Sequence, residues 1–127
     1  MRVLLVDDDP EIRHLVHLAL SRGGGHVVEC ATGGEEALQS VTERRPDAVL
    51  LDVLLPDADG VELLERLRRI EGMADVPVVF LTAKSSPADA ERLRRSDARG
   101  VIDKPFDPLA LTGEVERLVG SPTGSGD

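Results

Sequence analysis

The feature that most constrains the fold is an alternation of short aliphatic runs with longer amphipathic stretches. The runs lie at residues 3–6, 26–30, 48–51, 78–81 and 100–102, and they do not alternate apolar with polar residues. Strands without such alternation are typical of a parallel sheet that is covered on both faces. We therefore predict an α/β fold with a doubly wound, five-stranded parallel sheet and helices on both of its faces.

The stretches between the runs have the periodicity of helices. Apolar residues recur at helical spacing within 12–19, 37–41, 63–70 and 111–119, whereas the stretch from 87 to about 97 has few and is predicted to pack loosely. A capping side chain precedes a proline at Asp9-Pro10, Ser86-Pro87 and Asp107-Pro108. Residues 32–35 and 59–62 have capping-box spacing, and the glycines at 23–25 predict a helix stop.

Charge and composition exclude several classes of function. The formal net charge is -9, which argues against nonspecific binding to nucleic acid. With two Phe and no Tyr or Trp, the core is predicted to be aliphatic. Cys30 is the single cysteine, so no internal disulfide can form, and we expect it to be a small buried residue in a reducing, cytoplasmic setting. No apolar run approaches the roughly 20 residues that a membrane-spanning helix needs.

Polar side chains follow four of the five predicted strands. They are Asp7, Asp8 and Asp9 after the first strand, Asp52 after the third, Thr82 after the fourth and Lys104 after the fifth. Because functional residues of an open parallel sheet gather beyond the carboxyl ends of its strands, we expect these side chains to meet at one edge.

This set of side chains has the chemistry of a phosphoacceptor site. Adjacent carboxylates repel one another and persist as anions mainly around a cation, for which oxygen ligands favour Mg²⁺. A carboxylate can also attack phosphorus to form an aspartyl phosphate. Phosphoryl transfer mostly needs positioning and charge neutralisation, which a metal ion, Lys104 and the hydroxyl of Thr82 could supply.

Four short motifs in order resemble the receiver domain of two-component response regulators, the chemotaxis-regulator-like family. They are Val6-Asp7-Asp8, then Asp52 with Pro56 and Asp59-Gly60, then Leu81-Thr82-Ala83, and finally Lys104-Pro105-Phe106. The resemblance covers about residues 2–119 and implies a flavodoxin-like (βα)5 fold with strand order 2-1-3-4-5. We expect a receiver domain at residues 1–119 and a flexible tail or truncated linker at 120–127. A stand-alone protein and a receiver excised from a larger one both stay open, with a slight preference for the former.

The resemblance also implies a role for each site residue. Asp52 is the phosphorylated residue, and Mg²⁺, with Mn²⁺ as the alternative ion, is bound by Asp7, Asp8, Asp52 and the backbone carbonyl of Leu54. Thr82 and Lys104 contact the phosphoryl group and couple it to a conformational change. The Lys104-Pro105 bond resembles one that is usually cis in the family.

The implied partners follow from the same resemblance. The phosphoryl donor is a phosphohistidine on a sensor histidine kinase or a phosphotransfer protein. The surface of the fourth helix, fifth strand and fifth helix is expected to change its affinity for an output partner, and it offers a homodimer interface. We expect no direct binding of nucleic acid or membrane, and a switch that catalyses its own phosphorylation and slow dephosphorylation rather than a turnover enzyme.

Two positions depart from the family pattern. Val101 stands where many receivers have an inward-turning Tyr or Phe, so the aromatic part of the switch is missing. Leu54 borders the path of water to the phosphoryl group in the family, and its apolar side chain cannot orient that water. Slow self-dephosphorylation is therefore predicted.

Other interpretations compete with this one. A haloacid-dehalogenase-like phosphatase would use Asp7 and Asp9, but it would leave Asp52 without a role. A flavin-binding module would lack aromatic side chains to stack on the ring, and a nonphosphorylated receiver-like domain would often lack one of the site residues. We interpret Asp9 as a helix cap, His14 and His17 as surface residues rather than metal ligands, and the arginine pairs 68–69 and 94–95 as solvated helix faces.

Overall fold

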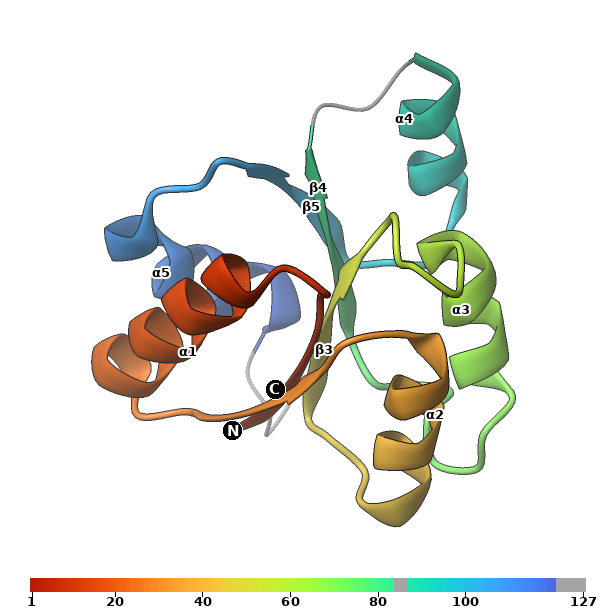
Figure 1. The fold of residues 1–127 in the computed structure, drawn as a ribbon, viewed down its shortest axis with the longest axis horizontal. Coiled ribbons are helices and arrows are strands. Elements are labelled where there is room, and N and C mark those ends of the chain that lie inside the picture. The colour runs from red at the N-terminus through yellow and green to blue at the C-terminus, as the bar shows by residue number, and fades with distance from the viewer. Residues whose placement is uncertain (84–86, 121–127) are drawn as a thin grey trace.

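A computed structural model describes residues 1–83 and 87–120 of the chain. Strands and helices alternate along it (Figure 1). In order they are β1 (Arg2–Val6), α1 (Pro10–Gly24), β2 (Val27–Ala31), α2 (Gly34–Glu43), β3 (Ala48–Asp52), α3 (Gly60–Arg68), β4 (Val78–Ala83), α4 (Pro87–Arg95), β5 (Gly100–Lys104) and α5 (Pro108–Val119). The predicted Ser86 cap and the tail at 121–127 lie outside the described residues.

All strand pairs are parallel, and the sheet order is β2-β1-β3-β4-β5, as predicted. Helices α1 and α5 lie on one face of the sheet, whereas α2, α3 and α4 lie on the other (Figure 1). The chain therefore moves from β1 outward to β2, then crosses back past β1 to begin β3. This reversal of direction opens a crevice at the carboxyl ends of β1 and β3, where such folds bind ligands.

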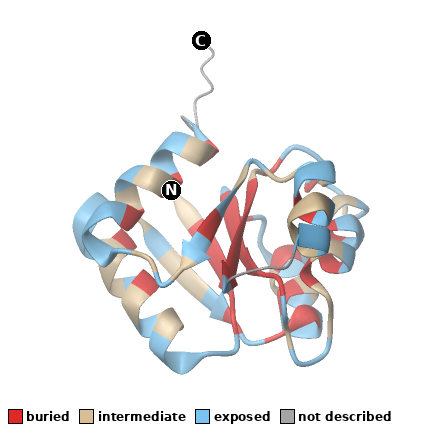
Figure 2. Cartoon of the chain, turned by 90° about the horizontal axis from the view of Figure 1, so that it is seen from above, coloured by how far each residue is buried: buried red, intermediate tan, exposed pale blue. Residues whose placement is uncertain are grey.

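The core consists of two apolar layers, one on each face of the sheet. Figure 2 shows the buried strands between helices whose outer sides are exposed. Among the described residues the core is mainly aliphatic, and Phe80 is the largest fully buried side chain. The partly buried Phe106 packs against one of the two layers. The prediction that both faces of the strands are covered is confirmed for β3, which is buried at every position. It does not hold for the edge strand β2, where Val27 is exposed. Cys30 also lies on this edge strand and is exposed, so the prediction of a buried cysteine was wrong.

At the described helix ends, several predicted caps are confirmed and one is wrong. Asp9, Asp59 and Asp107 each accept a hydrogen bond at the start of their helix, and Gly25 ends α1 with a φ of 67° that favours glycine. The capping box at 32–35 is wrong, because α2 begins after Gly33, which has no side chain to cap it. The carboxylate of Asp57 replaces the cap by accepting from the backbone N–H groups of Gly34 and Glu35, at 2.8 and 3.2 Å.

Three further expectations concern single residues or one helix. His14 and His17 are exposed, as interpreted. Arg68 is not a solvated side chain: it is half-buried and donates to the carbonyls of Met73 and Val76. Helix α4 buries a single side chain, that of Leu93, and its loose packing remains a prediction. In the described part of the chain, no helix combines the length and apolarity needed to cross a membrane.

Candidate functional site

Asp7 occupies the first position beyond β1 and is completely buried. Its backbone N–H donates to Ala31 of β2, which extends the strand pairing by one residue and fixes the direction of the side chain. One carboxylate oxygen, Oδ1, accepts from the backbone N–H of Asp9 at 2.9 Å. The guanidinium of Arg13 holds the Asp7 carbonyl at 3.1 Å, so both ends of the residue are tied in place.

Asp52 is the last residue of β3 and is only 8% exposed. Its Oδ1 accepts from the backbone N–H of Leu54 at 3.3 Å. Gly60 packs directly behind it, since a Cβ at that position would lie 2.6 Å from the Asp52 carbonyl oxygen and 2.8 Å from the Cα of Val53. The glycine therefore allows the start of α3 to abut the end of β3 and support the loop that carries Asp52.

Lys104 reaches both carboxylates from the end of β5. Its Nζ donates to Asp7 Oδ2 at 2.8 Å and lies 3.5 Å from Asp52 Oδ2. Burial acts to lower the pKa of Lys104, but the hydrogen bond to Asp7 and the negative charges of Asp52 and Asp7 outweigh burial and raise it. The lysine is therefore a permanent cation in the crevice.

Asp52 has a raised pKa, and the causes oppose one another. Desolvation by burial raises it most, and the charge of Asp7 raises it further, whereas Lys104 and the Leu54 N–H lower it. One lysine thus fails to offset the cost of holding two neighbouring carboxylates away from water. An anionic Asp52 would gain from a second cation in the crevice.

Asp8 completes an acidic cluster at the open side of the crevice. One oxygen from each of Asp7, Asp8 and Asp52 lies within 4.8 Å of the others, and Asp8 is exposed while the other two are buried. Three carboxylate oxygens from one side match the partial shell of a hard divalent cation that keeps waters on its other side. The donor set therefore fits Mg²⁺ or Mn²⁺.

The remaining predicted site residues lie at the ends of β3 and β4 and within β5, outside the acidic cluster. Thr82 is buried at the end of β4, but its hydroxyl donates to the carbonyl of Ala83 at 2.8 Å. Leu54 is 78% exposed beside Asp52, and Val101 is 37% exposed on β5. The peptide bond between Lys104 and Pro105 is cis, as expected.

Two acidic residues in the loop that follows Asp52 make long-range contacts that no sequence pattern predicts. Asp57 caps α2, and its pKa is lowered by the hydrogen bonds from Gly34 and Glu35. Asp59, predicted only as a cap of α3, also pairs with Arg92 of α4 at 2.6 Å. No local signal could reveal these contacts, because each joins residues more than 20 positions apart.

The phosphatase alternative finds no support in this geometry. Asp9, which it would use as a catalytic group, accepts a hydrogen bond from the backbone N–H of Glu11 and caps α1. Asp52, which it would leave without a role, belongs instead to the acidic cluster, and Lys104 contacts both Asp52 and Asp7.

Comparison with known proteins supports one family. The family profile described as the response regulator receiver domain matches residues 3–116. The phosphate regulon transcriptional regulatory protein PhoB of Pseudomonas aeruginosa is 35% identical over 125 residues, which are 98% of this chain and 54% of that protein. The chain thus spans about half the length of the curated relatives it matches.

Solved structures agree with the sequence relatives. A putative response regulator from Chloroflexus aurantiacus superposes with a TM-score of 0.84 at 36% identity, covering 93% of this chain and 96% of that one. The receiver domain of a Pseudomonas aeruginosa sensor histidine kinase, with a magnesium ion coordinated in its active-site cleft, gives 0.83 at 31% identity over 94% and 98% of the two chains. The chain therefore belongs to the response regulator receiver domain family and is a signal-transduction domain of two-component systems.

Proposed function

We propose that this domain accepts a phosphoryl group on Asp52 and uses a divalent cation to do so. The observation that carries the proposal is the convergence of Asp7, Asp8 and Asp52 within 4.8 Å, with the ammonium of Lys104 against two of them. Three different strand ends supply these groups to a crevice that has no other evident use for them. The haloacid-dehalogenase-like alternative is not favoured, since the family match and the position of Asp52 both oppose it.

The proposed cation is Mg²⁺, held by Asp7, Asp8, Asp52 and the backbone carbonyl of Leu54. When bound, it supplies positive charge to the equatorial phosphoryl oxygens and brings them close to Asp52. The support from this chain is the donor set itself and the raised pKa of Asp52, which signals an uncompensated buried carboxylate. The relative with magnesium in its cleft supports the same assignment.

In the proposed reaction, a carboxylate oxygen of Asp52 attacks the phosphorus of a phosphohistidine in line with the bond to nitrogen. The O–P bond of an acyl phosphate forms as the P–N bond breaks, and the electron pair returns to the imidazole of the donor. Lys104 is placed to stabilise the transferred charge, because its Nζ already lies 3.5 Å from Asp52. The domain is modified once per event and is not a turnover enzyme.

In the proposed mechanism, the phosphoryl group on Asp52 changes the protein surface through its contacts with Thr82 and Lys104. The Thr82 hydroxyl now donates to Ala83, so contact with the phosphoryl group requires it to leave that hydrogen bond and rotate. We propose that this movement changes the face formed by α4, β5 and α5, where an output partner or a second copy binds. A sensor histidine kinase or phosphotransfer protein is the proposed donor, and the cytoplasm is the proposed location.

The test is incubation with acetyl phosphate and Mg²⁺, followed by intact mass measurement. The expected result is a gain of one phosphoryl group that is absent in Asp52→Ala and in the presence of a chelator. Asp9→Asn serves as the matched control, because it removes one carboxylate from the same chain segment and should leave the gain intact. A phosphoryl group that persists in Asp52→Ala but disappears in Asp9→Asn would overturn the proposal.

A further inference from the structure

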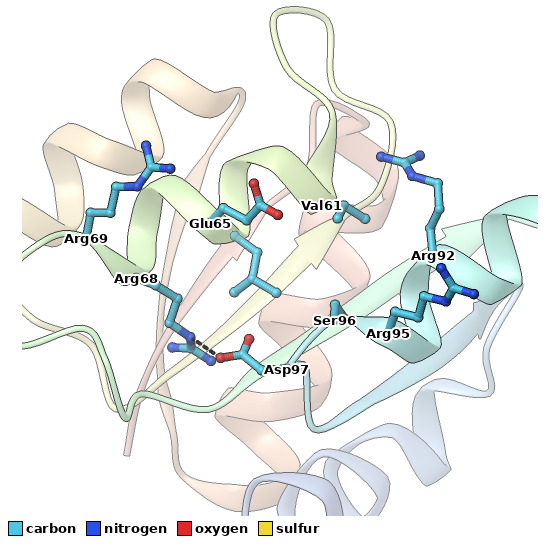
Figure 3. A pocket seen from close by; sticks show the side chains of 9 residues that line it. Val61, Glu65, Arg68, Arg69, Arg92, Arg95, Ser96 and Asp97 are labelled. Atoms are coloured by element: carbon cyan, nitrogen blue, oxygen red, sulfur yellow. Dashed lines mark hydrogen bonds and ion pairs between the residues drawn. The ribbon is translucent and has the colours of Figure 1, made fainter.

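A pocket of about 540 Å³ lies between α3 and α4 (Figure 3). None of the acidic-site residues lines it, and it lies on the α3 side of α4, away from the face that α4 forms with β5 and α5. The partly buried Val61 of α3 gives it apolar surface, and Leu64, which is only 2% exposed, forms its apolar floor. Four arginines line it together with two carboxylates, those of Glu65 and Asp97. The lining therefore carries more positive than negative charge, on a chain whose net charge is -9.

Two of the four arginines hold the pocket walls together. The Nε of Arg68 pairs with Asp97 at 2.9 Å, and its Nη1 donates to the carbonyls of Met73 and Val76. Arg92 pairs with Asp59 at 2.6 Å, and the hydrogen bond raises the pKa of the guanidinium. The two pairs connect α3 to α4 and to the segment after it, so both guanidinium groups are already committed.

The other two arginines are available to a ligand. Arg69 is exposed, and its side chain has no hydrogen bond or ion pair with the part of the chain that the structure describes. The side chain of Arg95 is 79% exposed and pairs with Glu91 one turn away on the same helix. Exposed pairs of this kind contribute little, about 0.3–0.5 kcal/mol, and exchange readily for another carboxylate. Figure 3 shows Arg69 and Arg95 on opposite sides of the apolar surface.

We propose that this pocket is a docking site for an acidic segment of a protein partner. An apolar side chain of the segment packs against Val61 and Leu64, and carboxylates on either side of it pair with Arg69 and Arg95. Charge complementarity selects the partner, since available cations flank an apolar patch on an otherwise acidic chain. A compact phosphate fits less well, because the two available guanidinium groups come from separate walls with apolar surface between them.

The interaction is expected to be local and modest in affinity. The net charge of -9 repels an acidic partner at long range, whereas screening beyond about 8 Å in physiological salt leaves contact pairing dominant. Docking uses no residue of the acidic site, so it goes beyond the proposed phosphoacceptor function and can be tested on the unphosphorylated chain.

The test is a titration of the ¹⁵N-labelled full chain with a short helical peptide in which one leucine is flanked by glutamates one turn before and one turn after it, on the same face. Amide shifts are expected to concentrate at residues 61–69 and 92–97. The double variant Arg69→Glu with Arg95→Glu should weaken binding by about tenfold or more, equivalent to about 1.4 kcal/mol. The same spectra report whether each variant is folded.

Arg94→Glu is the matched control, because Arg94 lies on the same helix, is 73% exposed, pairs with the same Glu91 and does not line the pocket. Its affinity should change by less than about twofold. Equal weakening by Arg94→Glu, or equal binding of a peptide with lysine in place of glutamate, would show nonspecific attraction and overturn the proposal. It would also fail if pyrophosphate shifted the pocket amides while the glutamate peptide did not.

Discussion

Replacement of Asp52 by asparagine should stabilise the metal-free domain, although it removes a group in contact with a lysine. Oxygens of Asp7 and Asp52 lie within 4.8 Å of each other, a separation at which an effective dielectric of about 20 gives a repulsion of about 3.5 kcal/mol. The attraction of Lys104 to Asp52 at 3.5 Å is about 4.7 kcal/mol on the same scale. These two contributions cancel to within about 1 kcal/mol.

The cost of burying the carboxylate then decides whether Asp52→Asn raises or lowers the unfolding free energy. Desolvation of a buried carboxylate costs several kcal/mol, and desolvation is the largest influence on the pKa of Asp52. Because Asp52 keeps 8% exposure, some of this cost is relieved by water, and we expect Asp52→Asn to gain about 1–2 kcal/mol. Lys104 stays paired with Asp7 at 2.8 Å, so the variant leaves no unpaired cation.

The assay is urea unfolding followed by circular dichroism, since the chain has no Trp or Tyr to report by fluorescence. Asp75→Asn, at an exposed position, is the control for the loss of one charge. In a magnesium concentration ten times its dissociation constant, the wild type should gain about 1.4 kcal/mol and Asp52→Asn should lose most of that gain.

The pH dependence gives a second check with a definite sign. The folded-state pKa of Asp52 is raised, so its ionised form lowers stability at neutral pH, and this cost disappears as the pH falls through the folded pKa. The advantage of Asp52→Asn over wild type should therefore be largest at neutral pH and should shrink toward zero in acid. If the variant is less stable than Asp75→Asn without metal, or keeps the full magnesium response, the electrostatic reasoning is wrong.

Three further predictions concern the loop and helices around the site. Gly60→Ala should lower the unfolding free energy by about 1–3 kcal/mol, because the new Cβ would clash with the backbone of Asp52 and Val53. Gly113→Ala on α5, where the Cβ would meet open space, should be neutral or stabilising, and thermal unfolding distinguishes the two variants. Asp57→Ala should cost about 1 kcal/mol through loss of the α2 cap, while Asp75→Ala should cost less than half as much in the same urea assay. Leu54→Asn should shorten the lifetime of the phosphorylated domain several-fold, as followed by intact mass after donor removal; an unchanged lifetime would contradict the role given to this side chain.

Much of the fold and the position of the site follow from local pattern in the sequence. Unalternating aliphatic runs identified the strands, and the residue after each run identified the groups that meet at the sheet edge. This works because parallel strands share a direction, so their carboxyl ends lie together whatever the detailed packing. Asp7, Asp52 and Lys104 could therefore be placed together although they span nearly the whole chain.

Only the tertiary structure decided how individual side chains are used. The cap of α2 comes from Asp57 rather than from a residue next to the helix in sequence. Arg68 donates to two backbone carbonyls, and Cys30 is exposed because β2 is an edge strand. The hydrogen bond from the Thr82 hydroxyl to the carbonyl of Ala83 is likewise visible only in the structure, and the predicted switch role of Thr82 stays a prediction. Each of these outcomes depends on which polar groups the packing of the helices on the sheet places next to a side chain. Periodicity in the sequence predicts only which face of its helix or strand a residue occupies.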